Sequence, residues 1–308
     1  MAQANMSALY FFEPLPVSAL YLTGKDALPL LQRLSTNDLL YHGEGKVKAT
    51  LFLNAQGRVL ERALVRSAGE DVTLFLPAGR EQHLAPYLQK NIFFRDEVSI
   101  ARSEEWLQLE IHGSEFAALL HEWQERFSAL TIVPYSNGKE CSWSLFCTRD
   151  IVEDVVRAME DSPLNVSTGN PAMREYFRVK QGIPAIGHEL STEYIPLELG
   201  LWEEVSFTKG CYVGQEIIAR MESRRQLARI LVTLELEDSV PIESPLYFDD
   251  RRIGKITSIA RSPEGNYVAL AVIRREYAIP GAKLNLPQQK VTAVVQSIAG
   301  QPPDWVIP

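Results

Sequence analysis

The hydrophobic pattern of the chain changes near Arg225, and this change most constrains the fold. Before it, strand-like and helix-like patterns alternate. After it, only strand-length apolar segments follow one another, at 227–236, 253–260, 267–274 and 291–298. Short strands separated by turn residues such as Pro280-Gly281 are typical of a small antiparallel barrel. We therefore expect a C-terminal β-barrel over residues 226–308 and a mixed region over residues 1–225.

Residues 1–225 contain similar elements twice. Strands expected over 46–53 and 58–66 flank the turn 54–57, and strands over 130–135 and 142–147 flank Ser136-Asn137-Gly138. Ser114 is placed to cap one helix, and Asn170-Pro171 starts another. A chain of 308 residues exceeds the ~250–300 at which single cores stop growing. We predict an α+β fold with two intertwined α/β subdomains before the barrel.

Composition narrows the function classes. The formal net charge of −8 argues against a protein that coats nucleic acid, and we expect no direct nucleic-acid binding. No apolar run approaches the ~18 residues of a membrane span, so we expect no membrane association. The N-terminus shows no secretory pattern. Three cysteines do not form a disulfide framework, so we expect a cytoplasmic protein.

One stretch stands out chemically, Lys209-Gly210-Cys211-Tyr212-Val213-Gly214-Gln215-Glu216. Glycine is used where the backbone takes positive φ or where another group comes close. We therefore expect Cys211 on a tight, exposed turn. A thiol reacts or binds metal as the thiolate, and a free thiol titrates near ~8.5. Lys209, or a helix that starts at Gln215, would lower that pKa. The alternative is a buried cysteine that fills a small apolar hole.

This string closely resembles the signature of the YgfZ-type folate-binding proteins, relatives of the glycine-cleavage T-protein (aminomethyltransferase). Four further blocks resemble the same family: Ile195-Pro196-Leu197-Glu198-Leu199-Gly200, Val205-Ser206-Phe207-Thr208, Leu34-Ser35-Thr36-Asn37-Asp38 and Leu53-Asn54-Ala55-Gln56-Gly57-Arg58-Val59. The order of the blocks agrees with the family over most of the chain.

The resemblance implies an aminomethyltransferase-like ring of subdomains around a pocket for tetrahydrofolate or a related reduced folate. It implies an accessory protein that supports assembly or repair of iron–sulfur enzymes, including tRNA-modifying ones, with those proteins or their assembly factors as partners. The site residues it implies fall into three groups: Cys211 and Lys209 as catalytic residues; Gly210, Tyr212, Gly214, Gln215, Glu216 and Arg220 as motif residues; and Asn54, Glu198 and Arg220 as folate contacts.

Two departures from the T-protein pattern disfavour aminomethyl transfer. T-proteins carry two aspartates just after the glycine of the first hairpin, whereas this chain has Glu61 and the cation Arg62 at the comparable place. An adjacent guanidinium works against a carboxylate that stabilises a cationic one-carbon unit. Lys180 lies near the place of the family's folate-contacting glutamate. Aminomethyl transfer with Glu61 as the acid remains one alternative, and a non-catalytic ligand-binding scaffold is another.

One further candidate site, a cluster of arginines, has several possible ligands, and the sequence patterns of metal and nucleotide sites are absent. Four arginines follow the motif: Arg220, Arg224, Arg225 and Arg229. Their guanidinium groups are suited to binding the glutamate tail of a folate, an RNA backbone or the local acids Glu216 and Glu222. No Cys-x-x-Cys occurs and the five histidines show no ligand spacing, so we expect no metal site, with Cys141 and Cys147 as filler. Phosphate-binding glycine loops are absent from the sequence.

Overall fold

A computed structural model describes residues 9–40, 45–136 and 141–308. Asn137 and Gly138 of the expected second hairpin turn, and His42, lie outside these described residues. The chain divides into two compact units that are interleaved along the sequence. Unit 1 takes in Met1–Leu30, His42–Lys48 and Ala63–Pro171, and unit 2 takes in Leu31–Tyr41, Ala49–Arg62 and Ala172–Pro308.

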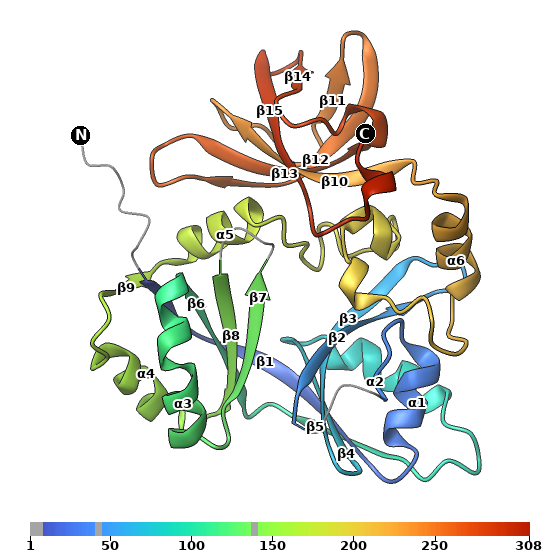
Figure 1. Cartoon of the computed structure of the whole chain (residues 1–308), viewed down its shortest axis with the longest axis vertical. Helices are drawn as coiled ribbons and strands as arrows, with labels where there is room; N and C mark the ends of the chain where they lie inside the picture. The colour runs from blue at the N-terminus through green and yellow to red at the C-terminus, as the bar shows by residue number, and fades with distance from the viewer. Residues whose placement is uncertain (1–8, 41–44, 137–140) are drawn as a thin grey trace. The chain divides into compact units, whose positions relative to one another are not determined.

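Strand β1 organises the sheet. Within the described residues the strands run in the order β2-β3-β4-β1-β6-β8-β7, with β5 and β9 also paired to β1 (Figure 1). Their bounds are β1 (Leu9–Thr23), β2 (Val47–Leu53), β3 (Val59–Ala68), β4 (Asp71–Pro77), β5 (Ser99–Ser103), β6 (Trp106–His112), β7 (Thr131–Ser136), β8 (Cys141–Thr148) and β9 (Val166–Gly169). The register of β1 against β6 shifts between Phe12 and Leu15, next to Pro14, which has no N–H to give to a ladder.

The helices of unit 1 bury their apolar sides on this sheet. Phe116, Trp123 and Met159 join residues of β1, β6 and β8 in one hydrophobic core. The elements are α2 (Glu81–Lys90), the 3₁₀ helix η1 (Ser114–Leu119), α3 (Leu120–Arg126) and α4 (Val152–Glu160), while α1 (Ala27–Leu34) crosses the division between the units. The predicted Ser114 cap is wrong: Gly113 is the cap residue, without a side-chain bond. The Ser114 hydroxyl instead lies 3.4 Å from the Glu115 carboxylate.

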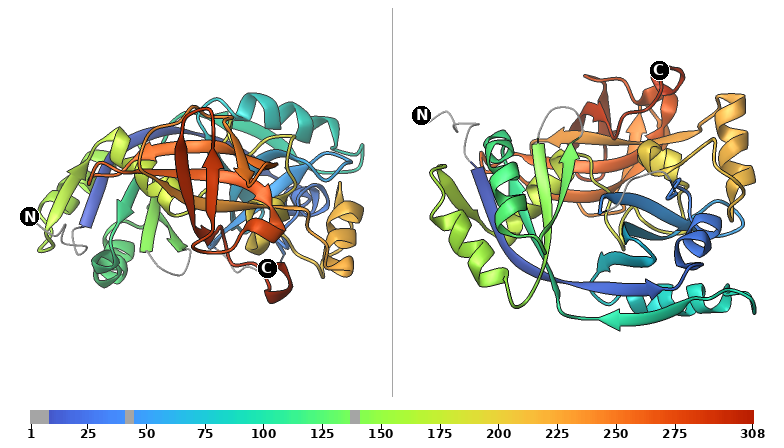
Figure 2. Two further views of the ribbon diagram at one scale, coloured as in Figure 1. Left: turned by 90° about the horizontal axis from the view of Figure 1, so that it is seen from above. Right: turned by 60° about the horizontal axis from the view of Figure 1, so that its bottom comes forward.

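The C-terminal barrel is confirmed. Strands β10-β13-β12-β11-β14-β15 close on themselves through antiparallel pairing of β10 with β15. Figure 2 shows the barrel in orange to red. Their bounds are β10 (Arg229–Leu236), β11 (Pro245–Phe248), β12 (Arg251–Arg261), β13 (Tyr267–Arg274), β14 (Lys283–Leu286) and β15 (Val291–Ile298). The domain boundary expected at Arg225 stays a prediction, and the chain passes it between α6 (Gln215–Arg224) and β10.

The segment that carries the motif is irregular and is held to the barrel by buried polar groups. Helix α5 (Pro171–Lys180) begins at Pro171 as predicted, and the chain then passes through the 3₁₀ helices η2 (Pro196–Leu199) and η3 (Trp202–Glu204) before α6. Arg178 donates to the Ile183 carbonyl (2.7 Å) and to Ser258 of β12 (2.8 Å). Ser258 donates in turn to the fully buried Glu189 (2.7 Å). The remaining short helices are η4 (Arg275–Tyr277) and η5 (Asp304–Val306).

Within the described part of the chain, the helices are too short or too polar to cross a lipid bilayer.

Candidate functional site

The Cys211 thiol lies at the surface, immediately before a turn formed by Tyr212–Gln215. The side chain is exposed and forms no disulfide. The backbone N–H of Gln215, the first residue of α6, donates to the Tyr212 carbonyl at 3.3 Å and closes the turn just after the cysteine. The predicted exposure of Cys211 is therefore confirmed, and the alternative of a cysteine buried in an apolar hole is wrong.

The two glycines of the motif have different roles. Gly214 takes a φ of 83°, and a β carbon there would lie 2.6 Å from the Asn54 carbonyl oxygen and 3.0 Å from the Cα of Gly57. Both the conformation and the space therefore require glycine. At Gly210 the φ is outside the positive range and a β carbon would meet no atom within 4 Å. The expectation of a constrained glycine holds for Gly214 and fails for Gly210.

The Asn54 turn packs directly against the motif. Its side-chain Oδ1 accepts the backbone N–H groups of Gln56 (3.0 Å) and Arg58 (2.9 Å), so the amide oxygen shapes the turn between β2 and β3. A β carbon at Gly57 would lie 3.0 Å from the Cβ of Ile217 in α6. The structure thus brings two predicted site segments, 54–57 and 210–216, into contact within unit 2. Asn54 Nδ2 forms no hydrogen bond with the described residues.

Lys209 is buried rather than extended toward solvent. Its Nζ donates to the carbonyl oxygens of Ser35 (2.8 Å) and Asn37 (2.7 Å). The same ammonium lies 5.4 Å from the centroid of the Tyr212 ring, within cation–π distance. Tyr212 is buried, and burial raises the pKa of its phenol to about 12. Lys209 and Tyr212 therefore anchor the chain on the two sides of Cys211.

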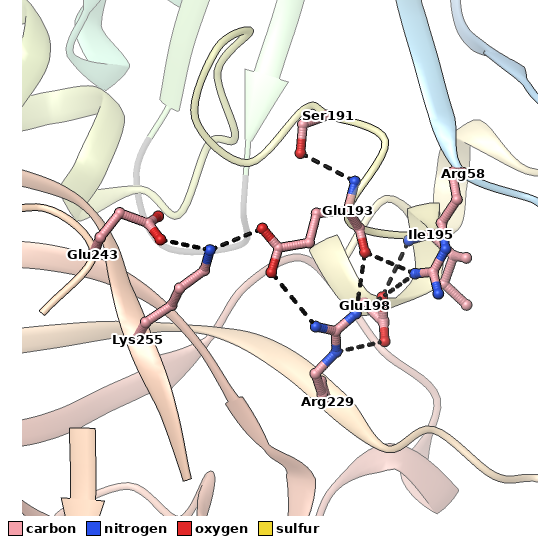
Figure 3. A network of polar contacts seen from close by, with 8 residues as sticks. All are labelled: Arg58, Ser191, Glu193, Ile195, Glu198, Arg229, Glu243 and Lys255. Carbon is pink, nitrogen blue, oxygen red and sulfur yellow. Dashed lines mark hydrogen bonds and ion pairs between the residues drawn. The ribbon is translucent and has the colours of Figure 1, made fainter. Parts of the chain in front are cut away.

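The Glu198 carboxylate is surrounded by groups of the protein itself (Figure 3). Its oxygens accept from the Ile195 N–H (3.1 Å), from Nε and Nη2 of Arg229 (3.0 and 3.2 Å) and from Nη1 of Arg58 (3.3 Å). Only 8% of the Glu198 side chain is exposed. The expectation that Glu198 contacts a cofactor does not fit this geometry, because four donors already occupy the carboxylate.

The same network extends to the barrel surface through Glu193 and Lys255. Lys255 of β12 bonds Glu193 (2.8 Å) and Glu243 (2.7 Å). Burial opposes ionisation of Glu193, but the hydrogen bond and charge of Lys255 outweigh it and lower the pKa of the Glu193 carboxyl. Tyr194 lies between Arg229 and Lys255, with the guanidinium 5.0 Å from its ring centroid. Burial, and then the negative charge of Glu193, raise the pKa of Tyr194 to about 12.

The arginines after the motif separate into two groups. Arg229 belongs to the Glu198 network, whereas Arg220, Arg224 and Arg225 are exposed and form no side-chain ion pair with the described residues. Glu216 and Glu222 are exposed as well, and neither pairs with these arginines among the residues described. The alternative in which these two acids neutralise the cluster is therefore wrong. Arg220 remains available to an anionic ligand.

Glu61 and Arg62 have different environments. Glu61 is 3% exposed and shares the buried side of β3 with Val59. Arg62 makes a two-pronged pair with Glu204, with Nη2 2.7 Å from Oε1 and Nε 2.8 Å from Oε2. Glu204 thus supplies a counter-charge for the Arg62 guanidinium.

The remaining cysteines belong to unit 1, whereas the motif belongs to unit 2. Cys147 is buried in β8, where burial raises the pKa of its thiol to about 12, and Cys141 is exposed at the start of the same strand. In the described parts of the chain no three His, Cys, Asp or Glu side chains are grouped in a way that could hold a metal ion.

Three groups of residues at the site escaped the sequence reasoning. The buried segment Ser35-Thr36-Asn37 receives Lys209, and Arg58 and Glu204 balance the charges of Glu198 and Arg62. All three lie in or beside blocks quoted for the family resemblance, yet sequence alone gives no sign of which partner each side chain takes.

Comparison with known protein families matches both ends of the chain. The profile described as the GCVT N-terminal domain matches residues 6–149, and the profile of the glycine cleavage T-protein C-terminal barrel domain matches residues 229–298. The crystal structure of the glycine cleavage system aminomethyltransferase T from Bartonella henselae superposes with a TM-score of 0.77 and 17% identity, over 94% of this chain and 86% of that one. This likeness establishes the fold.

Curated relatives agree with that fold. The tRNA-modifying protein YgfZ of Colwellia psychrerythraea is 23% identical over 90% of this chain and 89% of its own length. An aminomethyltransferase of Caldanaerobacter subterraneus is 24% identical over 92% of this chain and 82% of its own. A putative chloroplastic transferase of Arabidopsis thaliana is 33% identical, but over only 40% of this chain and 29% of that protein.

Proposed function

We propose that this chain, which belongs to the YgfZ-type proteins of the aminomethyltransferase fold, is a folate-binding accessory protein that supports the assembly or repair of iron–sulfur enzymes, including tRNA-modifying ones. The observation that carries the proposal is the exposed Cys211 thiol, which lies between the anchored residues Lys209 and Tyr212. One relative, aligned over 90% of the chain, is named as a tRNA-modifying protein. Its name supports the assignment to tRNA-modifying enzymes.

The donors at the site suit a reduced folate such as tetrahydrofolate. A folate ends in glutamate carboxylates, and arginine is the side chain that best matches a carboxylate. Arg220 is exposed and unpaired among the described residues, and Asn54 offers the Nδ2 amide as a hydrogen-bond donor. We assign Asn54 and Arg220 to folate binding and remove Glu198 from that role. A bound folate would carry one-carbon units; the residues named here would bind and orient it.

Cys211 is the residue we assign to the partner. Its thiolate is a nucleophile and a soft ligand, and its exposure lets a protein that carries a cluster intermediate reach it. The cluster belongs to the partner, because a single cysteine does not hold one. The other motif residues orient the turn: Gly214 by its conformation, and Gln215 and Tyr212 by closing it.

A Cys211→Ala variant tests the function. A cell that depends on this protein should lose the activity of its iron–sulfur tRNA-modifying enzymes with Cys211→Ala, whereas Cys141→Ser should keep that activity. Circular dichroism and the melting temperature should be unchanged in both variants, since both side chains are exposed. Full activity of Cys211→Ala would instead support the non-catalytic scaffold.

Folate binding is tested separately by thermal stability. A ligand that binds only the folded state stabilises it by about 2.7 kcal/mol at a free concentration of 100 Kd. Tetrahydrofolate or folinic acid should therefore raise the melting temperature, and Arg220→Ala should reduce the shift. The absence of any shift at millimolar ligand would remove the folate from the proposal.

Aminomethyl transfer is the second candidate, and one observation favours it. Glu61 is a buried carboxylate on β3, and Arg62 beside it is paired with Glu204. Release of a one-carbon unit from an aminomethylated lipoyl carrier, abolished by Glu61→Gln, would support this reading over the accessory role.

A further inference from the structure

The Ser35–Asn37 segment is a buried element bound to the chain that precedes Cys211. Its three residues are 0%, 0% and 4% exposed. The carbonyl oxygens of Ser35 and Asn37 both accept from the Lys209 ammonium, and the Thr36 carbonyl between them accepts the Ser206 N–H at 3.0 Å. Three consecutive carbonyls thus face residues 206–209.

The side chains of this segment bind the same stretch of chain. The Thr36 hydroxyl donates to the Glu204 carbonyl at 2.6 Å, and Asn37 Nδ2 donates to the Glu203 carbonyl at 2.9 Å. Both side chains also bind the β2 strand: Thr36 Oγ1 accepts the Leu51 N–H (3.0 Å), and Asn37 Nδ2 donates to the Ala49 carbonyl (2.8 Å). The segment therefore joins β2 to residues 203–209 through groups that are buried and satisfied.

Two of the carbonyls of the Ser35–Asn37 segment bind Lys209, which lies two residues before Cys211. Lys209 is 8% exposed, and its own N–H donates to the Ser206 hydroxyl at 3.2 Å. Its ammonium also lies against the Tyr212 ring, on the other side of Cys211. The hydrogen bonds of the ammonium run to backbone carbonyls of the Ser35–Asn37 segment, so the lysine is suited to fixing the backbone around the cysteine.

We propose that Lys209 and the Ser35–Asn37 segment form a latch that positions the Cys211 thiol for its partner. Lys209 is then a positioning residue, in place of the electrostatic role expected for it. This inference deepens the proposed function and rests on the assignment of Cys211 as the group that meets the partner.

Two kinds of variant separate positioning from charge. Lys209→Met removes the ammonium, whereas Thr36→Val removes one hydroxyl of the latch and leaves the lysine charge in place. Lys255→Met is the matched control, because Lys255 lies in the same unit and its ammonium donates to the Glu193 and Glu243 carboxylates instead of to the Ser35–Asn37 segment. All variants are made in full-length protein that also carries Cys141→Ser, so that Cys211 is the exposed thiol of the described chain.

Three measurements are made on each folded variant: hydrogen exchange of residues 206–212, the pH profile of Cys211 alkylation by iodoacetamide, and iron–sulfur enzyme activity in cells. With a latch, Lys209→Met and Thr36→Val both raise exchange at least tenfold and lower cellular activity. The pH of half-maximal alkylation stays that of the parent protein, and Lys255→Met changes nothing.

The opposite pattern overturns the proposal. If Lys209→Met moves the alkylation profile by one pH unit or more and Thr36→Val leaves exchange and activity unchanged, the lysine acts by charge. Unchanged exchange in both variants also overturns it. Failure of the proposed function gives a different result from failure of the latch. If the proposed function is wrong, Cys211→Ala keeps cellular activity. The hydrogen-exchange measurement still tests the latch in that case.

Discussion

At the residue scale, burial separates one of the three cysteines from the other two. Cys147 is 0% exposed with a thiol pKa raised to about 12, while Cys141 and Cys211 are exposed. We expect iodoacetamide at pH 8 to label Cys141 and Cys211 in the native protein and to leave Cys147 unmodified until the chain is unfolded. Mass spectrometry of the digested protein checks this, and rapid native labelling of Cys147 would contradict the packing of β8.

The environment of Glu198 predicts how a substitution at this residue changes the stability of the protein. Glu198→Gln keeps the volume but leaves Arg229 and Arg58 facing a neutral amide. Because the arginines are about one-third exposed, solvent screens part of the loss, and we expect the free energy of unfolding to fall by about 1–3 kcal/mol. Urea unfolding measures it. Glu243→Gln, in the same network but 64% exposed, should cost at most about 1 kcal/mol; equal losses would argue against a special role of Glu198.

At the element scale, the cysteine turn can be dissected with its own glycines. Gly214→Ala should destabilise by more than about 1 kcal/mol, because it places a β carbon against the Asn54 carbonyl at positive φ. Gly210→Ala meets open space at ordinary φ and should be neutral or stabilising by up to about 1 kcal/mol. Denaturant midpoints compare the two, and a larger loss for Gly210→Ala would show that the turn differs from the one described.

Sequence pattern predicted the elements whose burial is periodic. β13 and β15 have the expected bounds, and α5 starts at the Asn170-Pro171 signal. Four short strands, β5, β9, β11 and β14, were missed, because four or five residues show too little alternation to stand out. At the site, the sequence located the exposed cysteine but not the hydrogen-bond partners of Lys209. The ammonium of Lys209 donates to the carbonyls of Ser35 and Asn37, which only the folded chain brings close to it.

At the scale of the whole molecule, two buried tyrosines predict the alkaline limit of stability. The pKa values of Tyr194 and Tyr212 are both raised to about 12 by burial, whereas a tyrosine in the unfolded chain ionises near ~10. Between these values the unfolded state binds fewer protons than the folded state, so the free energy of unfolding falls as pH rises. We expect stability to drop steeply from pH 10 to pH 12.

Urea unfolding at a series of pH values measures this slope, and Tyr212→Phe should make it shallower. A slope that is identical in the native and Tyr212→Phe proteins would mean that the phenol is open to solvent.

The latch described above joins parts of the chain that are made at different times. Lys209 meets carbonyls that lie 174 and 172 residues earlier in the sequence. At about 5–20 residues per second, a ribosome takes roughly 10–35 s to cover that interval. An excised peptide with the cysteine motif would lack its support altogether, so the motif cannot be transplanted as a short tag. The Cys211 thiol therefore gains these contacts of its neighbour Lys209 only late in synthesis, after most of the polypeptide has left the exit tunnel.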